Sequence, residues 1–176
     1  MHPSKHPAAL VALLLLASPA LAGPPEPAPG VDFSGSWVLD DSLSQPMDPI
    51  FALQDLSWAV RKAAASFDSK ATITQSADRL TVTFDNLLGE HRQELFFDGA
   101  PHTTVNPAGV PTTFSSAWAD GVKLVASGSL KNEEGQEGTL TEVRTLSEDG
   151  QVMTVQVQLT LSGGETASAV RAYRRQ

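Results

Sequence analysis

Short segments of alternating apolar and polar residues, separated by tight-turn residues, run through most of this chain. The clearest spans 151–161, where Val155, Val157 and Leu159 alternate with polar side chains, as in a strand with one apolar face. Asp-Gly and Gly-Gly pairs between segments supply the positive φ angles that tight hairpin turns require. Because no crossover helix separates the segments, the pattern predicts an antiparallel meander.

Nine segments are predicted to be strands. They are 33–39, 71–75, 80–84, 92–97, 112–118, 122–130, 139–146, 151–161 and a last strand that ends near Arg174. The stretch 99–110, which contains Pro and Gly, is assigned to a loop. A meander of this length with one apolar face has to close or find a second sheet, and closure removes the exposed edges. The expected fold is therefore all-β, an up-and-down antiparallel barrel of about eight to nine strands.

One helix is predicted between the first and second strands, at about 49–66. Asp48 is a typical capping residue and Pro49 suits the first helical position. The larger apolar face, expected to pack on the barrel, consists of Leu53, Leu56, Val60, Ala63 and Phe67. Phe51 and Trp58 fall on the opposite side and are the candidates for a portal or lid. Two interpretations stay open for this pair: burial beneath the 99–110 loop, or an exposed contact for a protein partner.

The first 22 residues have the character of a secretory leader. Lys5 precedes an apolar run too short to cross a bilayer, and Ala20-Leu21-Ala22 is typical of a cleavage site. The expected organisation is a leader at 1–22, a Pro-rich flexible spacer at 23–31 and a barrel domain at 32–176. Since the chain has no cysteine, it has neither a disulfide nor a lipid-anchoring Cys. We expect a periplasmic or secreted protein.

Without the leader, the chain carries 11 basic and 20 acidic side chains, a net charge of −9. A chain of this charge repels nucleic acid and anionic membrane surfaces, so neither is an expected partner. Scattered acidic residues more often serve solubility than recognition. We expect a monomer without stable membrane insertion.

The chain offers few residues for catalysis or metal binding. His91 and His102 are the histidines outside the leader, and neither has a second ligand at strand or helix spacing, so both are interpreted as surface residues. We find no nucleophile, metal-binding or phosphate-binding motif in the sequence after the leader. The sequence therefore predicts no metal, no cofactor and no enzyme. Turnover that depends on Glu90, His91 or His102 ranks last among the hypotheses.

A Gly-x-Trp motif, Gly35-Ser36-Trp37, begins the first predicted strand. A large ring at the narrow end of a barrel closes it, and Gly35 lets neighbouring backbone approach closely. A cation from the last strand is expected to cover the outer face of the Trp37 ring. Arg171 and Arg174 are the candidates for that cation.

The segments 32–44, 146–155, 163–164 and 172–174 resemble the opening strand and closing hairpins of secreted bacterial lipocalin-like barrels, a calycin-type family. The resemblance implies an up-and-down barrel with a lipophilic ligand in the lumen. The chain departs from that family in lacking its common disulfide and in carrying a long helix after the first strand. The location of this helix resembles the helical lid of intracellular fatty-acid-binding barrels.

The leading hypothesis is an exported barrel that binds a small apolar or amphipathic ligand in its lumen. The residues expected to line that lumen are Leu80, Val82, Phe84, Phe114, Trp118, Leu124, Val155, Val157 and Leu159. The same side chains would equally suit a dry, filled core. The alternative is therefore a protein-binding module with a filled core, because the opening strand is also similar to that of exported barrels that inhibit proteases.

Overall fold

The computed structural model describes residues 27, 30–64, 70–86, 89–105, 111–132 and 134–176. The predicted leader lies outside the described residues, as does most of the predicted spacer. Val31, placed in the spacer by the sequence, packs against the core, and its carbonyl accepts a hydrogen bond from Gln75 Nε2 at 3.0 Å.

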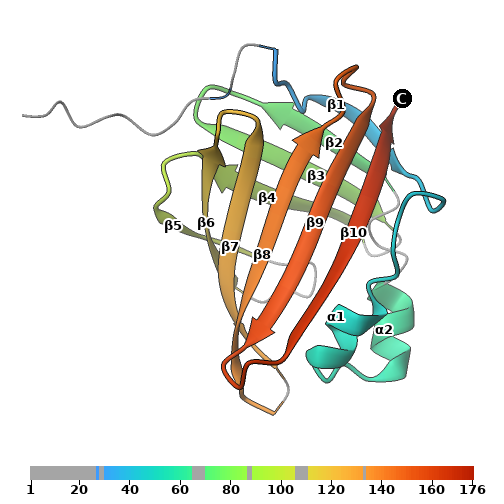
Figure 1. Cartoon of the computed structure of the whole chain (residues 1–176), viewed down its shortest axis with the longest axis vertical. Helices are drawn as coiled ribbons and strands as arrows, with labels where there is room; N and C mark the ends of the chain where they lie inside the picture. Colours follow the sequence, from blue (N-terminus) through green and yellow to red (C-terminus); the bar gives the residue numbers. More distant parts are fainter. Residues whose placement is uncertain (1–26, 28–29, 65–69, 87–88, 106–110, 133) are drawn as a thin grey trace, which may run out of the picture.

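Within the described residues, ten antiparallel strands form one sheet that curls into a barrel (Figure 1). They are β1 (Gly35–Leu39), β2 (Lys70–Gln75), β3 (Arg79–Asn86), β4 (Gly89–Phe96), β5 (Pro101–Val105), β6 (Pro111–Ala119), β7 (Lys123–Lys131), β8 (Glu137–Leu146), β9 (Val152–Leu161) and β10 (Thr166–Arg175). The spatial order is β4-β3-β2-β1-β10-β9-β8-β7-β6-β5, so β1 and β10 join the two ends of the chain. This is the predicted up-and-down barrel, with ten strands in place of eight to nine.

The additional strand is β5, which lies in the stretch that the sequence assigns to a loop. Its residues, Pro101-His-Thr-Thr-Val105, show no apolar alternation and begin with proline, which is tolerated at the start of an edge strand. In the described part of the sheet β5 pairs with β6 and forms no ladder with β4. Ser116 bridges the gap near one end, where its hydroxyl donates to Phe96 O at 2.6 Å and its carbonyl accepts from Gly99 N at 2.9 Å. The barrel is therefore nearly closed.

Aromatic rings pack together at the end of the barrel where β4 and β6 end and β1 begins. Trp118 stacks on Phe33 with ring centroids 5.8 Å apart and meets Phe97 edge-on at 5.3 Å. Trp37 is 1% exposed, and its Nε1 donates to Phe33 O at 2.9 Å. The indole of Trp37 thus belongs to the plug that fills this end.

The cation over Trp37 is Arg175, so the expectation that Arg171 or Arg174 takes this place is wrong. The guanidinium carbon of Arg175 lies 4.4 Å from the ring centroid of Trp37. The two residues are register partners in the β1–β10 ladder, which places their side chains on the same face of the sheet. Arg174 takes the opposite face, where it pairs with Asp40. Arg171 faces the lumen instead.

Gly35 makes room for this arginine. Its φ is 136°, a value that L side chains rarely adopt, and a Cβ there would lie 2.8 Å from Nη1 of Arg175. That guanidinium donates to Gly150 O at 2.9 Å, to Asp32 O at 3.0 Å and to Ser34 O, so it has little freedom to move. The close approach predicted for Gly35 is therefore to a side chain from the last strand.

We expect Gly35→Ala to lower the free energy of unfolding by about 1–3 kcal/mol, through backbone strain and the clash with Arg175. Urea denaturation followed by circular dichroism measures the change. Gly30→Ala is the matched control, because Gly30 also has a positive φ, of 90°, but nothing within 4 Å of the added Cβ. An equal loss in both variants would contradict a specific role for the Arg175 contact.

The predicted long helix is two short helices, α1 (Asp48–Leu53) and α2 (Trp58–Ala64), which lie together at one end of the barrel near β10 (Figure 1). The helical path breaks after α1, where Asp55 adopts a φ of 60°. Met47, and not Asp48, is the N-cap of α1. Neither described helix has the length and apolar character to cross a membrane.

The faces of the two helices also differ from the prediction. Ile50, which the predicted stripe omits, is 1% exposed and anchors α1 in the core. Leu53 packs against the same core, as expected. The side chains of Val60, Ala63 and Phe67 lie outside the described residues.

Candidate functional site

A cavity of about 350 Å³ lies inside the barrel, between α1 and the inner face of the sheet. Five of the nine predicted lumen residues line it: Val82, Phe84, Phe114, Val155 and Val157. Met47, Ile50 and Met153 add further apolar wall. The volume falls in the range of small-molecule sites in proteins, about 300–1,000 Å³.

The other four predicted lumen residues are buried but do not line the cavity. Leu80, Trp118 and Leu124 belong to the packed core. Leu159 is fully buried and lies against Gly138. The alternation of a strand fixes the face that a residue takes, but not its height along the barrel axis. The sequence therefore could not distinguish inward-facing residues of the packed core from those that line the cavity.

One wall of the cavity is charged, and sequence reasoning missed it. Glu142 and Arg144 are two residues apart on β8 and therefore share its inner face. Arg144 and Arg171 are both register partners of Val155 on β9, from opposite sides. Their Cα atoms are thus two strand spacings apart, about 10 Å.

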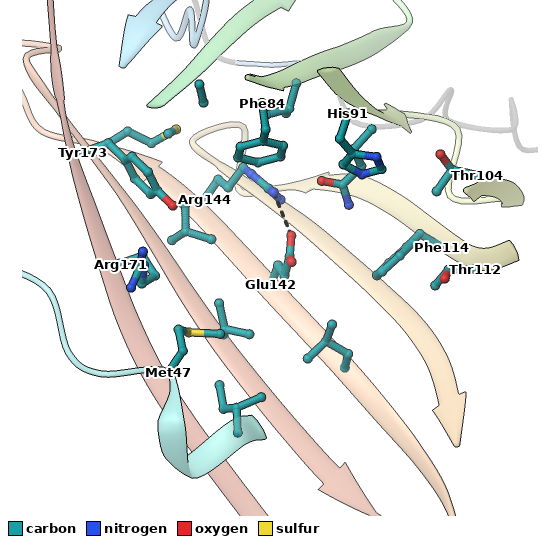
Figure 2. Close-up of a pocket in the computed structure, with 18 of the residues that line it drawn as sticks. Met47, Phe84, His91, Thr104, Thr112, Phe114, Glu142, Arg144, Arg171 and Tyr173 are labelled. Carbon is teal, nitrogen blue, oxygen red and sulfur yellow. Dashed lines mark ion pairs between the residues drawn. The ribbon is translucent and has the colours of Figure 1, made fainter. Parts of the chain in front are cut away.

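Glu142 and Arg144 form an ion pair in this wall (Figure 2). Oε2 of Glu142 lies 2.7 Å from Nη2 of Arg144, an ion pair without hydrogen-bond geometry, and the side chain of Arg144 is 5% exposed. Nη1 of the same guanidinium is buried and has no hydrogen-bond partner among the described residues. A buried donor without a partner costs about 1–3 kcal/mol, so such groups are rare in native structures.

Arg171 carries the second uncompensated donor. The residue is 8% exposed, and within the described residues its Nε is buried without a hydrogen-bond partner. Tyr173, two positions along β10, turns its hydroxyl into the same cavity (Figure 2). A buried guanidinium that faces an apolar cavity favours an anionic group there, because guanidinium–carboxylate hydrogen bonds are among the strongest in proteins.

His91 also lines the cavity, which corrects its interpretation as a surface residue. Its ring stacks on Phe84 with centroids 6.3 Å apart, and burial lowers its pKa below the usual value. His91 is therefore neutral at pH 7. His102 lies away from the cavity, stacked on Phe96 with Nε2 2.9 Å from Asp98 Oδ2.

The two lid candidates take different places. Phe51, expected on the face away from the barrel, lines the cavity. It also borders an outer groove of about 480 Å³ beside the helices, which Trp58, Arg61 and Lys62 share. Trp58 is 67% exposed, and Lys62 Nζ lies 5.8 Å from the centroid of its ring. The structure therefore does not bring Phe51 and Trp58 together in the lumen.

A hydrogen bond ties the lid to the barrel. Asn132, in the turn after β7, donates from Nδ2 to Oδ2 of Asp55 at 2.8 Å. Its own Oδ1 accepts from the backbone N–H of Gln136 at 2.8 Å, which fixes the side chain in place. Asp55 lies in the segment between the two helices, so this contact holds the α1–α2 turn over one end of the cavity.

We expect Asp55→Gly to speed amide exchange in α1 about fivefold, because one hydrogen bond of about 1 kcal/mol is lost. Glycine accepts the positive φ of this position, so no backbone strain is added. Exchange in β9 is expected to stay unchanged. Gln136→Ala is the control, since it removes a partner of Asn132 and leaves the bond to the lid. Unchanged exchange in α1 of Asp55→Gly would rule out this tether.

No protein-family model matches this chain, and no curated protein resembles it in sequence. Its fold is similar to that of the Schistosoma mansoni fatty acid binding protein solved with arachidonic acid, at a TM-score of 0.62 and 20% identity over 82% of this chain and 96% of that chain. The zebrafish ileal bile acid-binding protein, solved with cholic acid, matches with a TM-score of 0.61 and 16% identity, over 82% of this chain and 98% of that chain. The Echinococcus granulosus fatty-acid-binding protein 1 matches with a TM-score of 0.58 and 12% identity, over 81% of this chain and 96% of that chain. These TM-scores show that the chain shares the barrel fold of these proteins, which supports the predicted resemblance at the level of fold.

Proposed function

We propose that this protein carries one small lipophilic acid, with the hydrocarbon part in the barrel and the acidic head at Arg171. The observation that carries the proposal is a buried guanidinium with an unpartnered Nε on the wall of a mainly apolar cavity. A ligand carboxylate would supply the missing acceptor, and the hydroxyl of Tyr173 is placed to add a second hydrogen bond. The similar barrels bind fatty acids or a bile acid, which supports the same ligand class.

A cavity of about 350 Å³ favours a carrier over the alternative of a filled-core protein module. We infer binding and not turnover, since the similar solved structures are binding proteins and the charged groups of the wall suit an anion that is bound without reacting.

We also propose that the carrier is exported, because segment 1–22 resembles a secretory leader. Expression of the whole chain in a Gram-negative host tests this: the mass of the periplasmic product should correspond to a chain that starts at Gly23.

Calorimetric titration tests the proposed ligand class. The protein is purified without detergent, stripped of lipid, and titrated with dodecanoate and with methyl dodecanoate. We expect saturable binding of the acid at one site and at least tenfold weaker binding of the ester, because the ester lacks the charge that Arg171 pairs with. Absence of binding, or equal affinity for acid and ester, would refute the proposal.

A further inference from the structure

We propose that Glu142 sets the charge of the ligand, so that the cavity accepts a head group with one negative charge and disfavours a head group with two. The inference rests on the proposed function, because it concerns the same cavity. It gives a role to a partly buried carboxylate on a wall where an anion is expected to bind.

Glu142 is an acidic residue of the cavity wall. Its side chain lies on the inner face of β8, is 17% exposed and lines the cavity. The ion pair with Arg144, at 2.7 Å, neutralises that guanidinium from within the protein. Arg171 has no such carboxylate among its described neighbours and remains the cation without a counter-ion.

The described wall of the cavity contains three charged side chains, which are Glu142, Arg144 and Arg171. His91 is neutral at pH 7, because burial lowers its pKa. The wall therefore carries one net positive charge. A head group with one negative charge balances it.

A second negative charge would lack a counter-ion on a wall whose two arginines are themselves buried. Burial of an unpaired charge is strongly unfavourable, and the interaction between charges is stronger in a protein interior than in water. The second charge would also be repelled by the carboxylate of Glu142. A ligand ammonium would meet two guanidinium groups and a single carboxylate that is already paired. The arrangement thus selects monoanions over dianions and over cations.

Three ligands with the same dodecyl chain separate these cases: dodecanoate, dodecyl phosphate and dodecylamine. The titrations are run at about pH 8, where a phosphate monoester carries close to two negative charges. For the wild-type protein we expect dodecanoate to bind at least tenfold more tightly than dodecyl phosphate, and dodecylamine to bind more weakly than both. Tighter binding of dodecylamine than of dodecanoate would overturn the inference.

Glu142→Gln tests the residue itself. The substitution keeps the shape and the acceptor oxygen beside Arg144 while it raises the net charge of the wall by one. We expect the ratio of affinities to shift toward dodecyl phosphate by tenfold or more. A ratio that stays within threefold of the wild type would overturn the inference.

Two further variants, Arg144→Gln and the double variant Glu142→Gln/Arg144→Gln, test whether selectivity follows the net charge of the wall. Each changes the packing of the wall differently from Glu142→Gln. The single variant leaves no net charge on the wall, so both anions should bind more weakly than to the wild type. The double variant restores one net positive charge and should restore the wild-type preference for dodecanoate. A double variant that keeps the preference of Glu142→Gln would show that selectivity does not follow net charge.

The same titrations distinguish failure of the proposed function from failure of the charge inference. If wild-type protein binds no dodecanoate, the proposed function fails. If it binds dodecanoate but the affinity ratios do not change in the variants, the charge inference alone fails.

Discussion

Replacement of Arg171 by Gln is expected to weaken the binding of dodecanoate about 100-fold, which corresponds to about 2.7 kcal/mol. The loss follows from the burial of Arg171, since a charged hydrogen bond in a desolvated site contributes about 2–5 kcal/mol when one partner is removed. The free energy of unfolding is expected to stay the same or to rise, because the variant removes an uncompensated buried charge. Calorimetric titration and urea denaturation measure the two effects separately.

Arg174→Gln is the matched control for this experiment. Arg174 lies on the same strand but on its outer face, where it pairs with Asp40. The substitution makes the same change in net charge at an exposed position, so it should change the affinity for dodecanoate less than threefold. Equal losses in the two variants would mean that overall charge, and not the cavity guanidinium, attracts the ligand.

Replacement of Trp37 by Ala is expected to lower the free energy of unfolding by about 3–5 kcal/mol, as for other buried aromatic residues. The ring is 1% exposed, it donates a hydrogen bond to Phe33 O, and Arg175 covers it. Its removal leaves a void in the plug and leaves Arg175 without its aromatic partner. Urea denaturation followed by circular dichroism measures the change.

Trp58→Ala is the control, because it removes an indole that is exposed and not buried. Because Trp58 is 67% exposed, we expect a change below about 1 kcal/mol. A change below 1 kcal/mol for Trp37→Ala as well would show that the indole of Trp37 is not part of the structural plug.

The hairpins of this barrel could be predicted from local sequence. The glycines of the Asp149-Gly150 and Gly163-Gly164 turns have φ values of 68° for Gly150 and 95° for Gly164, as such turns require. The strands that flank these turns, β8 to β10, were predicted as strands for the same reason. Strand β5 was missed because Pro101-His-Thr-Thr-Val105 has no alternating apolar face, and its pairing with β6 is a tertiary property.

The break in the helix has a similar cause. The apolar spacing from Leu53 to Val60 continues through residues 54–57, so periodicity alone predicts one helix. In the structure Asp55 leaves the helical region and accepts a hydrogen bond from Asn132, which lies 77 residues away in the sequence. Such a distant partner cannot be identified from local pattern.

The charged wall was missed because its strands do not show a simple alternation. On β8 the inner face carries Leu140, Glu142 and Arg144, so charges occupy positions where apolar residues are expected. On β10 both faces carry arginine, Arg171 and Arg174, and the sequence does not say which one faces inward. One signal was available: β10 must pair with β1 if the barrel closes, and Arg175 is the register partner of the buried Trp37. Alternate residues of a strand share a face. The same parity would have placed Arg171 and Tyr173 on the inner face.

The structure of a complex with dodecanoate, solved by crystallography from lipid-free protein, tests the central claim most directly. We predict one ligand in the cavity, with its carboxylate within about 3 Å of the Arg171 guanidinium and its chain against Val155 and Val157. The Glu142–Arg144 pair should remain intact in the complex. A carboxylate at the solvent end of the cavity, with Arg171 still unpaired, would contradict the account, and so would a ligand bound outside the barrel.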